Sequence, residues 1–312
     1  MNPDDVALTS LDSLLFDGAE ATKGDLVAYL DAVSDRLIAQ LRDRPLSVMR
    51  VRPGQKPFMQ KNLPKGAPDW IERVGIWAET SKREVHYALC NDRATLRWLA
   101  NQRAVEYHPA LGHPQSHLVL DLDPPAGAAF GVVARTALLV REALASAGLS
   151  GALKTSGSKG VHIFVPVEAS GEAIAHATRA LAARAAALDP SVATTAYVVE
   201  EREGKVFVDA TRAGGATVVA AYSPRIRPGV PVSFPIAWDD VERVSPADFT
   251  IRTAPALLGD ADPWLDALPS PQRLPDALVE EGRAIPIARV AAMHEGKRRK
   301  RASAARDEQQ RG

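Results

Sequence analysis

The chain has 312 residues, of which 46% are hydrophobic and 24% are charged, a composition that is typical of a globular protein and excludes a disordered one. A single cysteine, Cys90, excludes an internal disulfide framework and a cysteine-based zinc site, and favours a reducing compartment. The sequence has neither a signal-peptide pattern nor an apolar run of the roughly 18–20 residues that span a membrane, so we expect a cytoplasmic protein with no membrane partner.

The 38 basic and 38 acidic residues cancel in total but are strongly segregated along the chain. Residues 1–35 carry eight acidic groups against one lysine, whereas residues 36–65 carry eight basic groups against one aspartate. A net charge of zero therefore does not exclude a nucleic-acid partner, and the basic block at 36–65 predicts a surface that lies along DNA.

Local sequence patterns predict intermixed helices and strands. Thr22 can cap a helix whose apolar residues recur at helical spacing, and alternating or short apolar runs predict the strands. In chain order, the expected elements are a helix at 22–41, strands at 46–52 and 84–90, a helix at 92–103, a strand in 117–125 stopped by its two prolines, a helix at 128–147, strands at 152–156 and 161–167, a helix at 171–188, and strands at 205–209, 216–222 and 231–236. Short helices and proline-rich connections follow from Trp238 onward.

This order of elements predicts an α+β (mixed α/β) fold. Neither an internal repeat nor a linker divides the sequence, so we expect one compact unit over residues 1–292. Residues 293–312 are basic and poor in apolar side chains, which predicts a disordered tail.

Three aspartates end apolar strands. Asp121 and Asp123 lie two residues apart, so both side chains are expected on one side of their strand. Two neighbouring carboxylates repel each other unless a cation lies between them, and Mg²⁺ and Mn²⁺ prefer oxygen ligands. Asp209 ends a later strand and would complete a three-carboxylate site for two metal ions, although each aspartate alone also fits an ordinary strand-end turn.

The segment from Ser156 to His162 has the composition of a phosphate-binding turn. Gly157 and Gly160 allow the backbone to approach an anion closely, while Ser156 offers a hydroxyl group and Lys159 a cation. It is not a P-loop, because the order is Gly-Ser-Lys-Gly and not Gly-Lys-Ser/Thr.

At these residues the sequence resembles the polymerase (primase-polymerase) domain of bacterial ATP-dependent DNA ligase D and its stand-alone relatives, in the archaeo-eukaryotic primase superfamily. The resemblance runs from about Thr9 to Trp264 and includes, in the family's order, ATKGDLVAYL, FMQKNLPKGAPDWI, VEYHP, HLVLDLDPP, LKTSGSKGVHIFVPV, VFVDATR and FTIRTAP. It implies a catalytic sheet like that of an RNA-recognition motif packed against an N-terminal αβ subdomain. It also implies addition of ribonucleotides or deoxyribonucleotides to a DNA 3′ end, assisted by two Mn²⁺ or Mg²⁺ ions.

The resemblance assigns expected roles to individual residues. Asp121, Asp123 and Asp209 match the catalytic metal carboxylates. The expected nucleotide-binding residues are Ser156, Lys159, His162, Arg212, Arg225 and Arg227. The expected DNA-binding residues are Lys23, Arg50, Phe58 and Lys61, and His108 falls on a further active-site position. Phe58 would stack on a template base, since every base presents a π face.

Three departures from the family pattern affect these expectations. Met59 follows Phe58 where the family usually has a second aromatic residue. Ser13 stands where relatives that grip a 5′-phosphate carry a second lysine besides that at position 23. The loop at 213–215 is one residue short and lacks an Asn and an Arg that are often present.

The expected partners are gapped or broken DNA with a 3′ hydroxyl, an NTP or dNTP, a separate ATP-dependent DNA ligase and an end-binding protein. Repair in a bacterium would place the protein at the nucleoid, but the residues do not choose between end joining and base excision repair. Two alternatives remain open: a catalytically inactive DNA-end-binding module, and a haloacid-dehalogenase-like phosphatase. Pro125 counts against the phosphatase, which normally has Thr or Val at that position.

Overall fold

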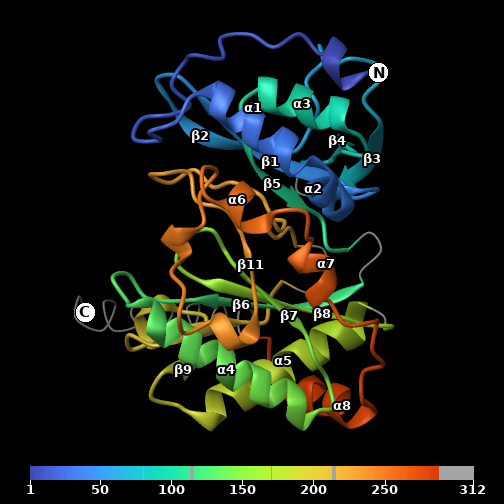
Figure 1. Ribbon diagram of the computed structural model, residues 1–312. Helices are drawn as coiled ribbons and strands as arrows, with labels where there is room; N and C mark the ends of the chain where they lie inside the picture. The colour runs from blue at the N-terminus through green and yellow to red at the C-terminus, as the bar shows by residue number, and fades with distance from the viewer. Residues whose placement is uncertain (80, 113–115, 170, 213–215, 288–312) are drawn as a thin grey trace, which may run out of the picture.

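The computed structural model describes residues 1–79, 81–112, 116–169, 171–212 and 216–287. Its strands form two sheets, one above the other in Figure 1, with the segment from about residue 218 to 268 running between them. The first sheet and its helices are called the N-terminal lobe, and the second sheet with its helices the C-terminal lobe. The prediction of an α+β fold is confirmed.

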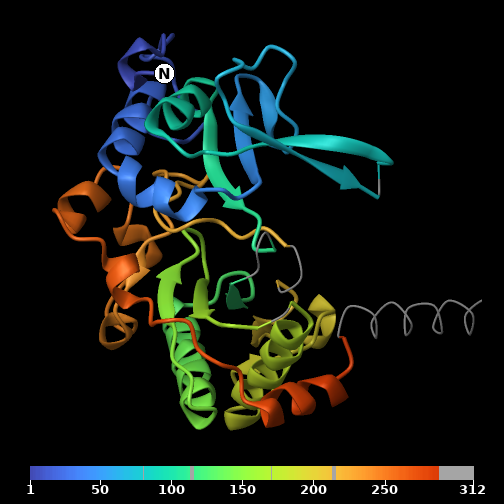
Figure 2. The same cartoon turned by 90° about the vertical axis from the view of Figure 1, so that its right-hand side faces the viewer.

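The N-terminal lobe is a five-stranded sheet with three helices. Its strands run in the order β2-β1-β4-β3, and β5 also pairs with β1. The elements are α1 (Lys23–Ala32), α2 (Ser34–Leu41), β1 (Leu46–Arg52), β2 (Gln55–Gln60), β3 (Arg73–Ala78), β4 (Arg83–Ala88), α3 (Arg93–Asn101) and β5 (Ala104–Pro109), preceded by the 3-10 turn η1 (Pro3–Asp5). Strands β3 and β4 form a hairpin that projects from the rest of the lobe (Figure 2).

A capping box begins α1, as the sequence predicts: the Thr22 hydroxyl accepts from the Asp25 amide, and the Asp25 carboxylate accepts from the Thr22 amide. The expected single helix over 22–41 is interrupted, because Val33 leaves the helical conformation at φ −106°, ψ 10° and is buried in the core. Two shorter helices therefore take the place of one.

The C-terminal lobe is a six-stranded sheet in the order β11-β7-β8-β6-β10-β9, antiparallel except for the pair β9 and β10. Helices α4 and α5 cover one face, and α8 packs against α5 (Figures 1 and 2). The elements are β6 (His117–Asp123), α4 (Phe130–Ser146), β7 (Ala152–Thr155), β8 (Val161–Pro166), α5 (Gly171–Leu188), β9 (Ala193–Thr194), η2 (Val199–Glu201), β10 (Val206–Asp209), β11 (Pro235–Ile236) and α8 (Asp276–Ala284). The opposite face of the sheet is left to carry polar side chains.

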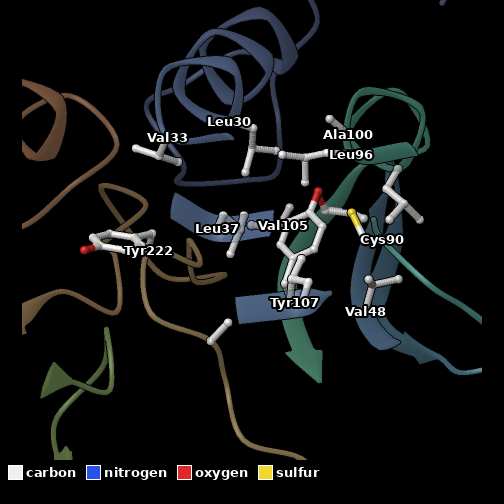
Figure 3. Packing of buried hydrophobic residues seen from close by; sticks show 14 of the residues in the cluster. Leu30, Val33, Leu37, Val48, Cys90, Leu96, Ala100, Val105, Tyr107 and Tyr222 are labelled. Atoms are coloured by element: carbon white, nitrogen blue, oxygen red, sulfur yellow. The ribbon is translucent and has the colours of Figure 1, made fainter. Parts of the chain in front are cut away.

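The segment between the sheets joins the two lobes. It contains η3 (Trp238–Asp240), η4 (Pro246–Asp248), α6 (Ala254–Leu258) and α7 (Pro263–Ala267). Tyr222 on this segment is fully buried beside the N-terminal core, where the Tyr29 hydroxyl donates to its carbonyl oxygen at 2.7 Å (Figure 3). The Tyr222 hydroxyl in turn donates to Asp262 at 2.5 Å. The core of the first lobe thus extends across this segment.

One predicted strand, at 216–222, is wrong, and another, at 231–236, is longer than the strand observed there. Residues 216–222 contribute one isolated bridge, between Thr217 and Ala110, and only Pro235–Ile236 of the expected strand at 231–236 pairs as a strand. Val218 and its apolar neighbours are buried between the lobes, so their composition serves packing and not strand pairing. Four strands were not predicted from the sequence: β2, β3, β5 and β9. Of these, β2 and β3 are too exposed to show a clear apolar pattern. In the described part of the chain, no helix is long and apolar enough to cross a membrane.

Candidate active site

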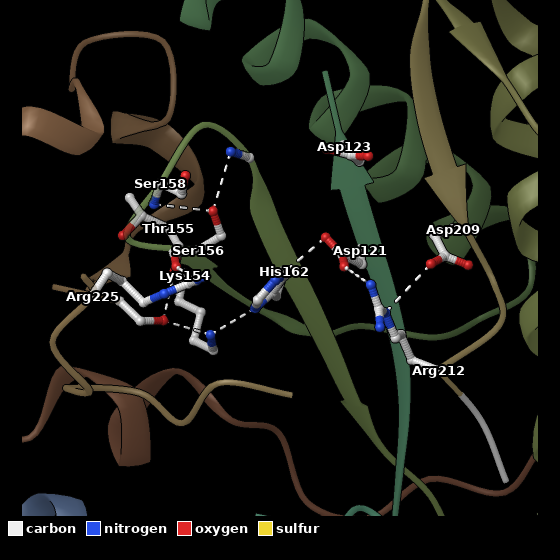
Figure 4. A network of polar contacts seen from close by, with 12 residues as sticks. Asp121, Asp123, Lys154, Thr155, Ser156, Ser158, His162, Asp209, Arg212 and Arg225 are labelled. Carbon is white, nitrogen blue, oxygen red and sulfur yellow. Dashed lines mark hydrogen bonds and ion pairs between the residues drawn. The ribbon is translucent and has the colours of Figure 1, made fainter. Parts of the chain in front are cut away.

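Two carboxylates meet on adjacent strands of the sheet of the C-terminal lobe. Asp121 on β6 is the direct cross-strand partner of Asp209 on β10, and Asp123 pairs with Phe207 two residues further along (Figure 4). Residues directly opposite each other on an antiparallel pair project to the same face of the sheet. Asp121 and Asp209 therefore share the polar face, and both side chains are largely buried.

Each of the three carboxylates has an arginine partner. Arg212 places Nη2 3.0 Å from Asp121 Oδ2 and Nε 3.3 Å from Asp209 Oδ2, so its guanidinium lies between the two acids. Arg202 places Nη1 3.2 Å from Asp123 Oδ2 and stacks over the ring of Phe207, 4.1 Å from its centroid. These arginines offset the repulsion that the clustered carboxylates would otherwise experience.

His162 on β8 approaches Asp121 from the other side, with Nε2 3.3 Å from Oδ1. Burial alone would raise the pKa of Asp121, but the contacts with His162 and Arg212 outweigh it and lower the pKa to about 2. Burial and the nearby Lys154 lower the pKa of His162 to about 4, so the ring is neutral at pH 7. Arg212 is then the charged group that faces Asp121 at neutral pH.

The turn between β7 and β8 is held by Ser156, whose hydroxyl accepts from the backbone amides of Ser158 and Gly160, both at 3.2 Å. Gly157 adopts a φ of +67°, which favours glycine. A Cβ on Gly160 would lie 2.0 Å from the Leu122 carbonyl oxygen, so only glycine lets the turn pack against the end of β6. The turn thus lies beside the strand that carries Asp121 and Asp123.

Glu106 on β5 connects this turn to the N-terminal lobe. Its buried carboxylate lies 3.2 Å from Arg225 Nε and 2.9 Å from His108 Nε2, and accepts from the Ile226 amide at 2.9 Å. Arg225 also donates to the Ser156 carbonyl oxygen. His108 and Arg225, which the sequence assigned to the site separately, are therefore held by one carboxylate that bridges the lobes.

The two other expected nucleotide-binding cations are at the surface. Lys159 is exposed at the tip of the turn that follows β7, and Arg227 is exposed two residues beyond Arg225, where it donates to the Ile226 carbonyl oxygen at 3.0 Å. The departure expected at 213–215 lies outside the described residues, as does the predicted tail at 293–312.

Among the expected DNA-binding residues, Phe58 and Lys61 line a hollow of about 390 Å³ between β2 and β4, which Tyr87 and Arg83 also line. Arg50 is buried on β1, where it is the cross-strand partner of Phe58, and its Nε donates to the Gln102 carbonyl oxygen at 2.7 Å.

The fourth of these residues, Lys23, is also buried. Its Nζ donates to the Thr9 carbonyl oxygen and to Asn101 Oδ1, both at 2.6 Å. Arg103 donates to the hydroxyl of Ser13 at 2.5 Å, so a cation contacts the position where relatives have a lysine.

Comparison with known proteins identifies the family. The family described as "LigD, primase-polymerase domain" matches residues 22–264, which is most of the chain. The chain belongs to this family. It is 31% identical over 279 residues to the bifunctional non-homologous end joining protein LigD of Bacillus subtilis, covering 86% of this chain and 45% of that protein.

The multifunctional non-homologous end joining DNA repair protein LigD of Mycobacterium tuberculosis is also 31% identical, over 255 residues that cover 76% of this chain and 33% of that protein. The chain thus spans less than half the length of these LigD relatives. The solved polymerase domain of M. tuberculosis ligase D, in complex with DNA, superposes with a TM-score of 0.76 at 28% identity, covering 84% of this chain and 97% of that one.

Membership of the LigD primase-polymerase family implies the use of divalent metal ions in nucleotidyl transfer. Within the described residues, no three His, Cys, Asp or Glu side chains cluster as a ready metal site. The donor set nevertheless fits a hard cation. Asp121, Asp123 and Asp209 supply carboxylate oxygens from the ends of neighbouring strands, and Arg212 already places positive charge between two of them.

Three side chains that complete the candidate site were not predicted from the sequence: Lys154, Glu106 and Arg202. Lys154 carried a signal, because a lysine in the middle of an apolar strand has to be explained by a partner. Glu106 lies two residues before His108 on β5, a strand that was not predicted. The position of Arg202 depends on a loop next to η2, and its sequence carries no comparable signal.

Proposed function

We propose that this chain is a DNA-directed nucleotidyltransferase that adds nucleotides to the 3′ end of gapped or broken DNA during repair. The observation that carries the proposal is the meeting of Asp121 and Asp209 on one sheet face, beside a glycine-rich turn that ends at His162. A phosphatase of the haloacid-dehalogenase type has no support from the family, and an inactive end-binding module does not require this set of carboxylates.

Asp121, Asp123 and Asp209 would hold divalent ions, for which we propose manganese or magnesium. When bound, such ions lower the pKa of an attacking hydroxyl group and neutralise charge on phosphate oxygens. Arg212 is positioned to balance the carboxylates of Asp121 and Asp209 while the site is assembled.

The triphosphate of an NTP or dNTP would bind beside the turn that ends β7. Lys159 and Arg227 are exposed cations that can reach a triphosphate from solvent, while Arg225 holds the turn from below through the Ser156 carbonyl oxygen. His162 presents its ring between this turn and Asp121. The buried Ser156 hydroxyl keeps the turn closed by accepting hydrogen bonds from two backbone amides. We propose that it contacts a phosphate oxygen only after one of these hydrogen bonds is broken.

The DNA would lie across the N-terminal lobe. Phe58 and Lys61 share the hollow between β2 and β4 with another aromatic and another basic side chain, which suits a stacked base and its phosphate. Arg50 is the cross-strand partner of Phe58, with its guanidinium carbon 5.7 Å from the ring centroid, and would act through that ring together with Arg52 at 4.9 Å. Lys23 and Arg103 place two cations next to Ser13, where they could attract a 5′-phosphate.

The LigD relatives are named for non-homologous end joining, and we propose the same repair route for this chain. Sealing would then require an ATP-dependent ligase activity, and an end-binding protein would present the break. Such a protein would act on the chromosome in the bacterial cytoplasm.

The proposal is tested by extension of gapped or overhanging DNA by one nucleotide with Mn²⁺ or Mg²⁺, comparing the full chain with the Asp121→Ala/Asp123→Ala variant. Wild type is expected to extend the primer, and the double variant to lose at least 10³-fold in rate, as expected when the main charge-stabilising groups are removed. Asp189→Asn is a matched control, because that aspartate also pairs with an arginine but lies outside the site. Equal extension by wild type and the double variant, or DNA binding without any extension, would refute the polymerase.

A further inference from the structure

Lys154 is a fully buried lysine that lies directly behind His162 (Figure 4). Its Nζ is 2.8 Å from His162 Nδ1 and 2.6 Å from the hydroxyl of Ser233. Among the ion pairs of the described residues, none includes Lys154. Buried lysines are rare unless they are paired, so the burial of Lys154 has to be explained by its two hydrogen bonds.

The direction of the hydrogen bond between Lys154 and Ser233 follows from the groups beyond Ser233. The Ser233 hydroxyl has one hydrogen. Its oxygen lies 2.7 Å from the Thr155 carbonyl oxygen, which can only accept. Ser233 therefore gives its hydrogen to Thr155 and accepts one from Lys154. The amine of Lys154 is thus fixed as a donor at this end.

The direction of the hydrogen bond between Lys154 and His162 follows from the contact that the other ring nitrogen makes with Asp121. Nε2 lies 3.3 Å from Asp121 Oδ1, and an ionised carboxylate can only accept. Nε2 must therefore carry a hydrogen, while Nδ1 lies 2.8 Å from the amine of Lys154, which has hydrogens to donate and already donates one to Ser233. Nδ1 can accept from Lys154, so the chain of hydrogen bonds is consistent from Thr155 to Asp121.

We propose that Lys154 is a positioning residue that holds His162 in the tautomer with its hydrogen on Nε2, directed at the active face of the sheet. In this state the ring offers one hydrogen-bond donor, which can be directed at Asp121 or at a phosphate oxygen of the bound nucleotide. The opposite tautomer would direct a lone pair at the same anionic groups and repel them. The nucleotide part of the inference rests on the proposed function, but the tautomer does not.

NMR spectroscopy of the full chain labelled with ¹⁵N-histidine tests the tautomer directly. The signals of His162 are assigned by their loss in His162→Gln, and Nε2 is expected to be protonated and Nδ1 not. Asp121→Asn separates the two influences on the ring, because an amide can either donate to Nε2 or accept from it. We expect the tautomer to persist in Asp121→Asn and to be lost when Lys154→Met is added.

A lysine at the start of β10 provides the control: Lys205→Met is expected to leave the signals of His162 unchanged. Protonation of Nδ1 in wild type, or loss of the tautomer in Asp121→Asn alone, would overturn the inference. Both of these spectra remain decisive even if Lys154→Met does not fold.

Nucleotide binding gives the second readout. Lys154→Met is expected to raise the Kd and the KM for the nucleotide roughly tenfold or more, as expected on losing a hydrogen bond to a charged group, with a smaller change in kcat. An unchanged nucleotide Kd in a variant whose tautomer has changed would contradict the role in nucleotide binding. Failure of DNA extension in wild type would refute the polymerase and leave the tautomer to be judged from the spectra alone.

Discussion

Asp121 and Asp209 are direct cross-strand partners, and the guanidinium of Arg212 lies within 3.3 Å of both carboxylates. This contact makes the positive charge of one arginine part of the stability of the site. The proposed metal site needs both carboxylates in their negative form, and without a cation between them they would repel. The folded protein therefore depends on a positive charge beside these carboxylates, and removing that charge should lower the free energy of unfolding.

Replacing Arg212 with methionine is expected to destabilise the protein at pH 7. A buried charge left without its partner typically costs about 3–5 kcal/mol, but 39% of the Arg212 side chain is exposed, so we expect a loss of roughly 1–2 kcal/mol in the free energy of unfolding. Because Mn²⁺ or Mg²⁺ can replace the missing charge, either ion should raise the Tm more in this variant than in wild type. Arg135→Met, which affects an exposed pair with Asp189, is the control, and an equal metal response in all three proteins would contradict the prediction.

Glu106 is expected to stabilise the contact between the lobes in a pH-dependent way. Burial alone would raise its pKa, but His108, Arg225 and the Ile226 amide lower it to about 2. A folded pKa below the unfolded value of about 4.3 means that this stabilisation is complete above pH 4.3 and is lost as the pH falls towards 2. Glu106→Gln should therefore cost roughly 2–3 kcal/mol at pH 7, and its difference from wild type should narrow below pH 4.

Urea unfolding at pH 7 and pH 3 measures both parts of this prediction. Glu84→Gln is a suitable control, since Glu84 also lies near a histidine but is exposed on the projecting hairpin. A Glu106→Gln variant as stable as wild type at pH 7 would show that the carboxylate is not needed to join the lobes.

His117 is expected to make the protein sensitive to mild acid. Burial, followed by the charge of Arg44, lowers its pKa to about 4, against about 6.5 when unfolded. Between these values the unfolded chain binds a proton that the native protein does not, so stability falls as the pH drops from 6.5 to 4. His117→Gln should remove roughly 1–2 kcal/mol of the loss that wild type shows between pH 7 and pH 5.

The free energy of unfolding at pH 7 and pH 5 tests this expectation. His86→Gln, at a histidine whose side chain is half exposed on β4, should leave the acid sensitivity unchanged. If His117→Gln loses as much stability in acid as wild type does, another buried group controls the response.

The sequence was sufficient to predict the parts of the site that are built from local patterns. Asp121 lies near the end of β6 and Asp209 ends β10, and the segment around Gly157 and Gly160 has turn composition, so strand alternation and backbone freedom already indicated their geometry. The family resemblance, which the comparisons confirm, then supplied the order of the segments.

What could not be predicted depends on contacts between distant segments. Glu106 acquires its importance from Arg225, 119 positions later, and only the packing of the lobes brings them to 3.2 Å. The apolar residues at 216–222 were read as a strand because burial and strand pairing favour the same residue types. The splitting of the first helix at Val33 likewise follows from tertiary packing, which outweighs the helical spacing.

The glycine at position 160 offers a sharp test of how the turn is docked. Its backbone does not need a positive φ, so Gly160→Ala changes only the space available, and the new Cβ would lie 2.0 Å from the Leu122 carbonyl oxygen. We expect the turn to move away from β6, with a loss of roughly 1–3 kcal/mol in stability and a larger loss in nucleotide affinity than in DNA affinity. Gly66→Ala is the matched control, since a Cβ there meets no atom within 4 Å. Equal nucleotide affinity in Gly160→Ala and Gly66→Ala would mean that the turn does not need to contact β6 to bind its ligand.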